Sequence, residues 1–330
     1  MISYLLKNIL LNFLIFFYIL KISYIFNLVD KPNERKKHLK PTAYTGGIAL
    51  SLIYILSVLL FDNAYIKLNL ILSIAFLIGI VGFIDDSYNL NIGSKLSLQI
   101  FPIFYLILFQ NLTLNNLGDY NFIKLELHSF SVVFTLLCVI FLINSFNYFD
   151  GLDGTLSYAT FSVLSILYFL VNDTNIRLFL LTISLPLLTF LFFNFSLFKL
   201  QKLFLGDSGS LLLGFIVAFS LIFLANEKII HPILLAWSIS IFVFEFLSIN
   251  LIRMINKKKL FKPGLDHLHH VLHKKTKSLN LTNIIIFTKN IIFFSFGYLS
   301  FKYINPDISL FLFIILFMFF FILRIKFLND

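Results

Sequence analysis

The sequence has 330 residues, of which 59% are hydrophobic and 13% charged, and it carries a net charge of +10 at pH 7. Soluble domains contain about 45–50% apolar and about 25% charged residues, so the composition excludes an ordinary soluble protein and indicates one that crosses a membrane several times. Because lysine and arginine gather in the cytoplasmic loops of membrane proteins, the positive charge is no sign of nucleic-acid binding.

Apolar runs of bilayer-crossing length recur along the whole chain. The first is too long for a signal peptide, and no small-residue cleavage site follows it. We therefore expect an all-α, polytopic integral membrane helical bundle of about eleven transmembrane helices, with ten as the alternative because span 155–171 is short and rich in Ser and Thr. The predicted spans are residues 2–29, 44–61, 68–84, 96–110, 128–146, 155–171, 176–194, 204–225, 231–252, 282–301 and 307–323.

Basic residues gather in every second gap between these spans. Eighteen lie in the odd-numbered gaps and the C-terminal tail, and five lie in the even-numbered gaps. The positive-inside rule therefore predicts an N-terminus outside and a C-terminus in the cytoplasm. We expect one transmembrane domain over residues 1–330, with cytoplasmic loops at residues 30–43, 85–95, 147–154, 195–206 and 253–281.

Five unusual polar clusters all fall in the odd gaps, and hence on the predicted cytoplasmic face. They read DKPNERKKHLKPTAYTGG (30–47), IDDSYNLNIGSK (84–95), NSFNYFDGLDG (144–154), LGDSGS (205–210) and KKKLFKPGLDHLHHVLHKK (257–275). The longest even gap, 111–127, has the composition of an ordinary polar loop. Because the polar clusters share one face, we expect them to build one site.

Two acidic residues, Asp85 and Asp86, end the third predicted span. A helix C-terminus disfavours each negative charge by about 0.3–1 kcal/mol, and adjacent carboxylates repel one another. A solvated helix end is one interpretation, since surface pairs cost little. A nearby cation explains the placement better.

The segment NSFNYFDGLDG places two more acids and two amides at the end of an apolar run. If the segment is helical, Asp150 and Asp153 share a face, as do Asn144 and Asn147. A simple Asp-Gly turn is the alternative, but it explains one Asp-Gly pair and not two such pairs together with two asparagines. Polar groups at such depth usually face a bundle interior or a water-filled cavity.

Asp207 begins the eighth predicted span, where two interpretations are evenly matched. Aspartate is a preferred helix N-cap, and the small residues after it also suit phosphate binding by free backbone amides.

His267, His269 and His270 lie in a basic loop. Zinc binding is disfavoured because the spacing is tight and no cysteine is near, and a loop held to anionic lipid explains the lysines but not three histidines. Hydrogen-bond donors for a diphosphate or a sugar fit better.

Carboxylates collected at the membrane surface need a hard cation. Mg²⁺ takes oxygen ligands and usually arrives with substrate phosphates, which the basic loops would bind. The residues alone therefore indicate phosphoryl-group chemistry at the cytoplasmic surface, with a lipid as one candidate reactant.

The ordered motifs resemble those of the polyprenyl-phosphate N-acetylhexosamine-1-phosphate transferases, over positions of about 30–275. DKPNERKKH is similar to the family's DxPxxRKxH, DDSYNLNIGSK to its DD signature with a following basic residue, NSFNYFDGLDG to NxxNxxDGxDG, and GDSGS to GDxGS. HLHH resembles the HIHH of the branch acting on UDP-N-acetylglucosamine, rather than the consecutive histidines of the phospho-MurNAc-pentapeptide branch.

The resemblance implies a Mg²⁺-dependent enzyme, with Mn²⁺ as an alternative, in the bacterial cytoplasmic membrane. It would transfer N-acetylhexosamine 1-phosphate from a UDP-sugar to undecaprenyl phosphate on the cytoplasmic face and release UMP. The implied metal ligand is Asp207, with Asp85, Asp86 and Asn147 as further candidates, and the implied catalytic residues are Asp85, Asp86, Asp150 and Asp153. The residues implied to bind substrate are Arg35, Lys36, His38, Lys95, Asn144, Asn147, Arg253, His267, His269 and His270.

Two positions depart from the family pattern. Glu245 stands where an aspartate is common, which leaves its role open, and Ala43 replaces a proline of the first loop. The sequence does not identify the sugar or the downstream glycan. It also leaves open whether the reaction passes through a covalent aspartyl intermediate and whether the protein is a homodimer. A multi-span transporter of an anionic substrate is the alternative function, although transporters place such acids near the membrane midplane.

Overall fold

The computed structural model describes residues 2–31, 40–60, 65–258, 264 and 266–329, which are mostly helical. The chain forms two compact units. The first contains residues 1–110 and 173–220, and the second contains residues 111–172 and 221–330.

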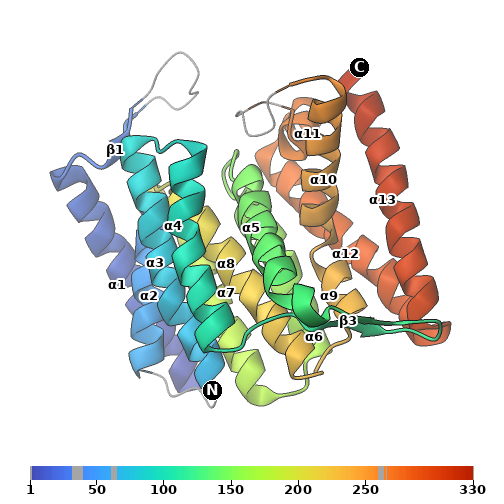
Figure 1. Ribbon diagram of the computed structural model, residues 1–330. Coiled ribbons are helices and arrows are strands. Elements are labelled where there is room, and N and C mark those ends of the chain that lie inside the picture. The colour runs from blue at the N-terminus through green and yellow to red at the C-terminus, as the bar shows by residue number, and fades with distance from the viewer. Residues whose placement is uncertain (1, 32–39, 61–64, 259–263, 265, 330) are drawn as a thin grey trace. The chain divides into compact units, whose positions relative to one another are not determined.

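Helices of the first unit run side by side (Figure 1). They are α1 (Ile2–Ile25), α2 (Gly46–Leu60), α3 (Ile66–Tyr88), α4 (Ile92–Phe104) with its π-helical extension η1 (Tyr105–Phe109), α7 (Thr174–Asn194) with the short turn η3 (Leu197–Lys199), and the start of α8 (Gly206–Asn226). Buried aromatic rings join α1 to α7, as where Phe16 and Phe193 lie 5.4 Å apart. Strands β1 (Val29–Asp30) and β2 (Thr42–Ala43) pair antiparallel, Val29 opposite Ala43.

The second unit gathers its helices around α12 (Leu279–Tyr303), which packs on several of the others. These are α5 (Ser131–Phe149), α6 (Thr155–Leu170), α9 (Pro232–Ser238), α10 (Ser240–Ile255), α11 (Leu268–Thr276) and α13 (Pro306–Asn329). A stacked pair of buried rings, Phe146 and Phe242, lies where α5 packs on α10.

Residues 111–127 are more ordered than an ordinary loop. Strands β3 (Asn116–Asp119) and β4 (Lys124–Glu126) form an antiparallel hairpin, followed by the 3-10 turn η2 (His128–Phe130). Our prediction of a plain polar loop was wrong here, because the stretch has too few alternating apolar residues to show a strand pattern.

In the described part of the chain each predicted span coincides with a helix, except that span 231–252 covers two, α9 and α10. Eight of these helices are long and apolar enough to cross a membrane, and α9 with α10 makes a ninth if this pair, bent by 71°, is one span. Helices α2 and α6 have 15 and 16 residues, fewer than the ~20 that a crossing needs. The protein is thus a multi-pass helical membrane protein, while eleven crossings and the orientation of the termini stay predictions.

Candidate active site

Four charged residues of the first unit form what we call the acidic cluster: Asp85, Asp86, Lys95 and Asp207. The two aspartates end α3, which closes where Asn89 adopts a left-handed conformation with φ of 51°. Asn91 then caps α4 by accepting a hydrogen bond from the Ser94 amide. This short connection turns the chain sharply and brings Lys95, in the first turn of α4, back to Asp85.

Lys95, which we expected to bind substrate, is paired here with two of the acids. Its Nζ lies 2.7 Å from Asp85 Oδ2 and also pairs with Asp207 Oδ2. The Leu90 amide donates to Asp85 Oδ1 at 2.8 Å. The side chains of Lys95 and Asp85 are 16% and 12% exposed and that of Asp207 is 32% exposed, so the cluster is accessible.

Asp86 has a different role, because it caps α8 from another helix. Its Oδ1 accepts the Asp207 amide at 3.0 Å, and its Oδ2 accepts the Ser208 amide at 3.2 Å. Asp86 therefore takes the N-terminal capping position that we had considered for Asp207, and its charge faces the positive end of the helix dipole. The side chain of Asp207 instead reaches Lys95.

Glycines allow the start of α8 to approach its neighbours closely. A Cβ at Gly82 of α3 would overlap the backbone of Ser208, and one at Gly47 of α2 would overlap that of Gly209. Gly206 has a φ of +74°, which favours glycine. Gly206 and Gly209 of GDSGS, together with Gly46 and Gly47 at the start of α2, therefore allow the close packing that places Asp207 beside Asp85.

The donor chemistry of the acidic cluster fits a hard divalent cation. Asp85 and Asp207 already direct carboxylate oxygens at one ammonium group, and carboxylate oxygens are the ligands that such a cation prefers. Within the described ranges no group of three His, Cys, Asp or Glu side chains is placed to hold a metal ion. Metal binding by Asp207, Asp85 and Asp86 therefore stays a prediction.

In the second unit, the segment NSFNYFDGLDG is helical only to Phe149. Asp150 closes α5, and the chain turns before α6 starts at Thr155, with Gly154 at a φ of +75°. Asn144 and Asn147 do lie three apart on α5, but the prediction that Asp150 and Asp153 share a helical face was wrong, because the glycines let the chain leave the helix.

A residue of α12 holds this turn. Asn283, which is fully buried, donates from Nδ2 to the Asp153 carbonyl at 2.9 Å and accepts from Thr155 Oγ1 at 2.8 Å. Sequence reasoning missed it, since a lone asparagine in an apolar run carries no motif. Its depth in a predicted span was the one available signal.

His267, His269 and His270, here called the histidine cluster, are not in a loop as we expected. His267 is the N-cap of α11, and the other two lie in its first turn. The rings of His269 and His270 are 4.2 Å apart, and a Cβ on Gly151 would overlap Nε2 of His269 and lie 3.0 Å from that of His270. The structure thus brings the histidine motif against the DG turn.

Burial keeps His267 and His269 neutral. It lowers the pKa of His267 to about 4, although Asp266 opposes the shift. It lowers the pKa of His269 well below its ordinary value, helped by His270. Neutral imidazoles suit hydrogen bonding to a sugar or a base better than neutralising a diphosphate.

Arg253, in the last turn of α10, is buried and forms a two-point pair with Asp266. Its Nε and Nη2 donate to the two carboxylate oxygens at 3.0 and 2.7 Å. Burial alone would raise the pKa of Asp266, but the arginine outweighs it and the pKa lies below the usual value.

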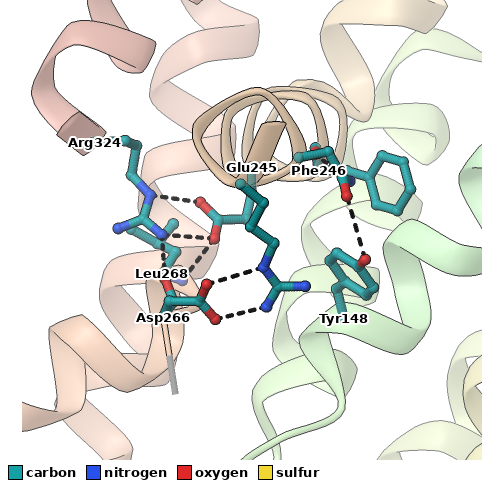
Figure 2. Close-up of polar contacts among 8 residues, drawn as sticks. Tyr148, Glu245, Phe246, Asp266, Leu268 and Arg324 are labelled. Carbon is teal, nitrogen blue, oxygen red and sulfur yellow. Dashed lines mark hydrogen bonds and ion pairs between the residues drawn. The ribbon is translucent and has the colours of Figure 1, made fainter. Parts of the chain in front are cut away.

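The role left open for Glu245 is now visible (Figure 2). Its carboxylate accepts the Leu268 amide at 2.7 Å and pairs with Arg324 of α13. Asp266 lies in the polar cluster 257–275 but was given no role, and Arg324 lies in none of the five clusters. A charged residue inside an apolar run, the signal shared by Glu245 and Arg324, marks such a pair.

The remaining predicted site residues, Arg35, Lys36 and His38, lie outside the described residues. The acidic cluster belongs to the first unit and the histidine cluster to the second, so their convergence on one pocket stays a prediction.

The model of the glycosyl transferase family 4 matches residues 68–225, from α3 to the end of α8. The chain is 26% identical to the undecaprenyl-phosphate alpha-N-acetylglucosaminyl 1-phosphate transferase of Escherichia coli K12, over 78% of this chain and 72% of that protein. It is 28% identical to the enzyme of that name from Salmonella typhi, over 76% and 71%. It is also 28% identical to a probable undecaprenyl-phosphate N-acetylglucosaminyl 1-phosphate transferase of Bacillus subtilis, over 88% and 82%. The matched residues include both aspartate motifs and the GDSGS segment, so this part of the chain is similar to glycosyl transferase family 4.

Proposed function

We propose that the protein transfers an N-acetylhexosamine 1-phosphate, N-acetylglucosamine 1-phosphate first among candidates, from a UDP-sugar to undecaprenyl phosphate at the cytoplasmic face of the bacterial cytoplasmic membrane. The observation that carries the proposal is the similarity to 1-phosphate transferases over most of both chains. The product would begin a lipid-linked glycan such as O-antigen or teichoic acid. The transporter alternative lacks support, since Asp85, Asp86 and Asp207 lie at helix ends.

The reaction is an in-line phosphoryl-group transfer. An oxygen of the polyprenyl phosphate attacks the β-phosphorus of the UDP-sugar and forms a new P–O bond. The bond from that phosphorus to the bridging oxygen breaks, and UMP leaves with the electron pair. The products are the polyprenyl diphosphate sugar and UMP.

The acidic cluster supplies the residues for this transfer. Asp207 and Asp85, which share one cation in the structure, would hold Mg²⁺ or Mn²⁺, and Asp86 would fix Asp207 by capping α8. When bound, the ion supplies charge neutralisation at the diphosphate. Lys95 would then release its carboxylates and pair with the polyprenyl phosphate, which Asp85 would orient.

The histidine cluster would recognise the sugar nucleotide. His267 and His269 are neutral and buried, and in the described structure Nδ1 of His267 and Nε2 of His269 make no hydrogen bond. Such buried polar atoms usually have a partner, and hydroxyl or carbonyl groups of the substrate would provide one. Asp150 and Asp153, in the turn that faces these histidines, would line the same site.

The test is UMP release by the purified protein in lipid nanodiscs. Undecaprenyl phosphate, labelled UDP-N-acetylglucosamine and Mg²⁺ should give UMP and a labelled lipid, and EDTA should stop both. A panel of UDP-sugars then identifies the donor. Labelled UDP-sugar that crosses a sealed vesicle without UMP formation would support the transporter instead.

A further inference from the structure

A buried ion pair joins two helices that carry none of the recognised motifs at the contact point. Glu245 of α10 and Arg324 of α13 are each 1% exposed. Nη2 of Arg324 donates to Glu245 Oε1 at 2.9 Å, and its Nε lies 2.9 Å from Oε2 without hydrogen-bond geometry. A paired charge buried to this degree is costly to maintain and calls for a purpose beyond stability.

Both members of the pair also bind the segment just before the histidines. Glu245 accepts the Leu268 amide, and Nη2 of Arg324 donates to the Asp266 carbonyl at 2.6 Å. The Asp266 side chain is held in turn by Arg253. Figure 2 shows Glu245 and Arg324 pointing toward one another, with Asp266 and Leu268 beside them.

Helix α11 depends on these contacts because it does not cap itself. His267 holds its N-cap position, yet its side chain makes no capping hydrogen bond. The carboxylate of Glu245 therefore occupies the place of a cap at the Leu268 amide, while Arg324 fixes the residue before the cap. The first turn of α11 carries His269 and His270, which face Gly151.

We propose that Glu245 and Arg324 are positioning residues: together they fix the start of α11 so that His269 and His270 are held against the DG turn in the geometry that receives the sugar nucleotide. The assignment of the nucleotide rests on the proposed function. The positioning itself does not, since it concerns only contacts within the second unit.

The first arm of the test needs no activity. Diethyl pyrocarbonate modifies accessible imidazoles, and mass spectrometry locates the products. His269 is 1% exposed and should react slowly in the intact protein. The double variant Glu245→Leu/Arg324→Met removes both charges and the acceptor of the Leu268 amide, and it should still fold, because replacing both partners of a buried pair is far milder than leaving one alone. We expect His269 modification to rise several-fold in it, and also in Arg324→Met if that variant folds.

The second arm is kinetic. Displaced histidines should raise KM for the UDP-sugar several-fold and leave KM for undecaprenyl phosphate unchanged, with Arg324→Lys intermediate. Ser309→Ala is the matched control in α13: Ser309 accepts the indole N–H of Trp237 at 3.0 Å and donates to the Gly297 carbonyl, far along the chain from Arg324. It should lower thermal stability without changing either KM or His269 reactivity.

The two arms separate the two proposals. Normal His269 protection in the folded double variant overturns the positioning role, as does an equal rise of both KM values. Increased His269 reactivity in a protein that releases no UMP from any UDP-sugar supports the positioning role and contradicts the proposed function.

Discussion

The acidic cluster and the histidine cluster are built in contrasting ways. In the first, carboxylates share a lysine at a partly exposed position, and Asp207 is 32% exposed. In the second, arginine–acid pairs hold Asp266 and Leu268, the neighbours of His267 in the chain. Glu245 and Arg324 are each 1% exposed. Exposed pairs exchange partners at little cost, whereas breaking a buried pair costs several kcal/mol. The acidic cluster is therefore suited to exchanging its cation, and the histidine cluster to holding one shape.

The largest expected effect is in the acidic cluster. Asp207→Asn keeps the size of the side chain but removes the charge that we assign to the metal, so UMP release should fall about 100- to 1,000-fold, as when a key electrostatic group is removed. Asp173→Asn is the matched control in the same unit, since Asp173 caps α7 and accepts the Tyr65 hydroxyl. Because asparagine caps a helix about as well as aspartate does, this control should leave both stability and kcat nearly unchanged. Full UMP release by Asp207→Asn would remove the metal role.

A substitution at Gly151 tests whether the histidine cluster must hold one shape. Gly151→Ala places a methyl group against His269, and the histidines must shift. We expect KM for the UDP-sugar to rise about 10- to 100-fold, because small displacements at a binding site are expensive. Gly93→Ala is the control: its added carbon meets only Asn91 Oδ1, at 3.4 Å. An unchanged KM in Gly151→Ala would show that the contact between these motifs does not matter for binding.

A third prediction concerns pH. The folded protein holds the pKa of His267 at about 4, below the ordinary 6.5. Between these pH values the unfolded chain takes up a proton that the folded chain does not. The contribution of His267 to the free energy of unfolding is therefore greatest above pH ~6.5 and decreases toward pH ~4, by at most about 3 kcal/mol. Thermal melting at about pH 7 and about pH 5 should show a smaller drop for His267→Gln than for the unchanged protein. Equal drops would argue against a buried neutral His267.

The smallest expected effect is at Asn283. Asn283→Ala removes the hydrogen bonds to the Asp153 carbonyl and the Thr155 hydroxyl. Leaving these groups unpaired should cost about 1–3 kcal/mol of stability, with a few-fold fall in kcat if the turn carries a catalytic acid. Ser295→Ala, on an exposed face of the same helix, is the control. Loss of stability without any change in kcat would make Asn283 purely structural.

One contact between near neighbours in the sequence was predictable in part. The pairing of Asp85 with a cation followed from two acids at a helix end, and Lys95 lies ten residues from Asp85 across one short connection. Apolar runs likewise predicted the position of each membrane helix. They did not predict the bend of 71° between α9 and α10, because a break inside an apolar run changes no hydropathy.

Contacts between distant segments were not predictable. Asp86 caps α8 across a separation of 121 residues, and Glu245 binds Arg324 across 79. No local pattern distinguishes such a capping aspartate from a catalytic one, since both are acids at a helix end. At Asp150 and Asp153 two local patterns disagree. Their spacing fits a helix, but the two glycines make a turn equally favourable, so the sequence could not decide between them.

The place of Arg324 in α13 has a consequence for biosynthesis. The ribosome delivers Glu245 and the histidines to the membrane before it delivers α13. During that interval Glu245 lacks its arginine partner, and the segment before the histidines lacks the contact that Arg324 makes with the Asp266 carbonyl. On the inference above, a half-made enzyme would bind sugar nucleotide poorly, and insertion of α13 would be the step that makes the newly synthesised protein competent.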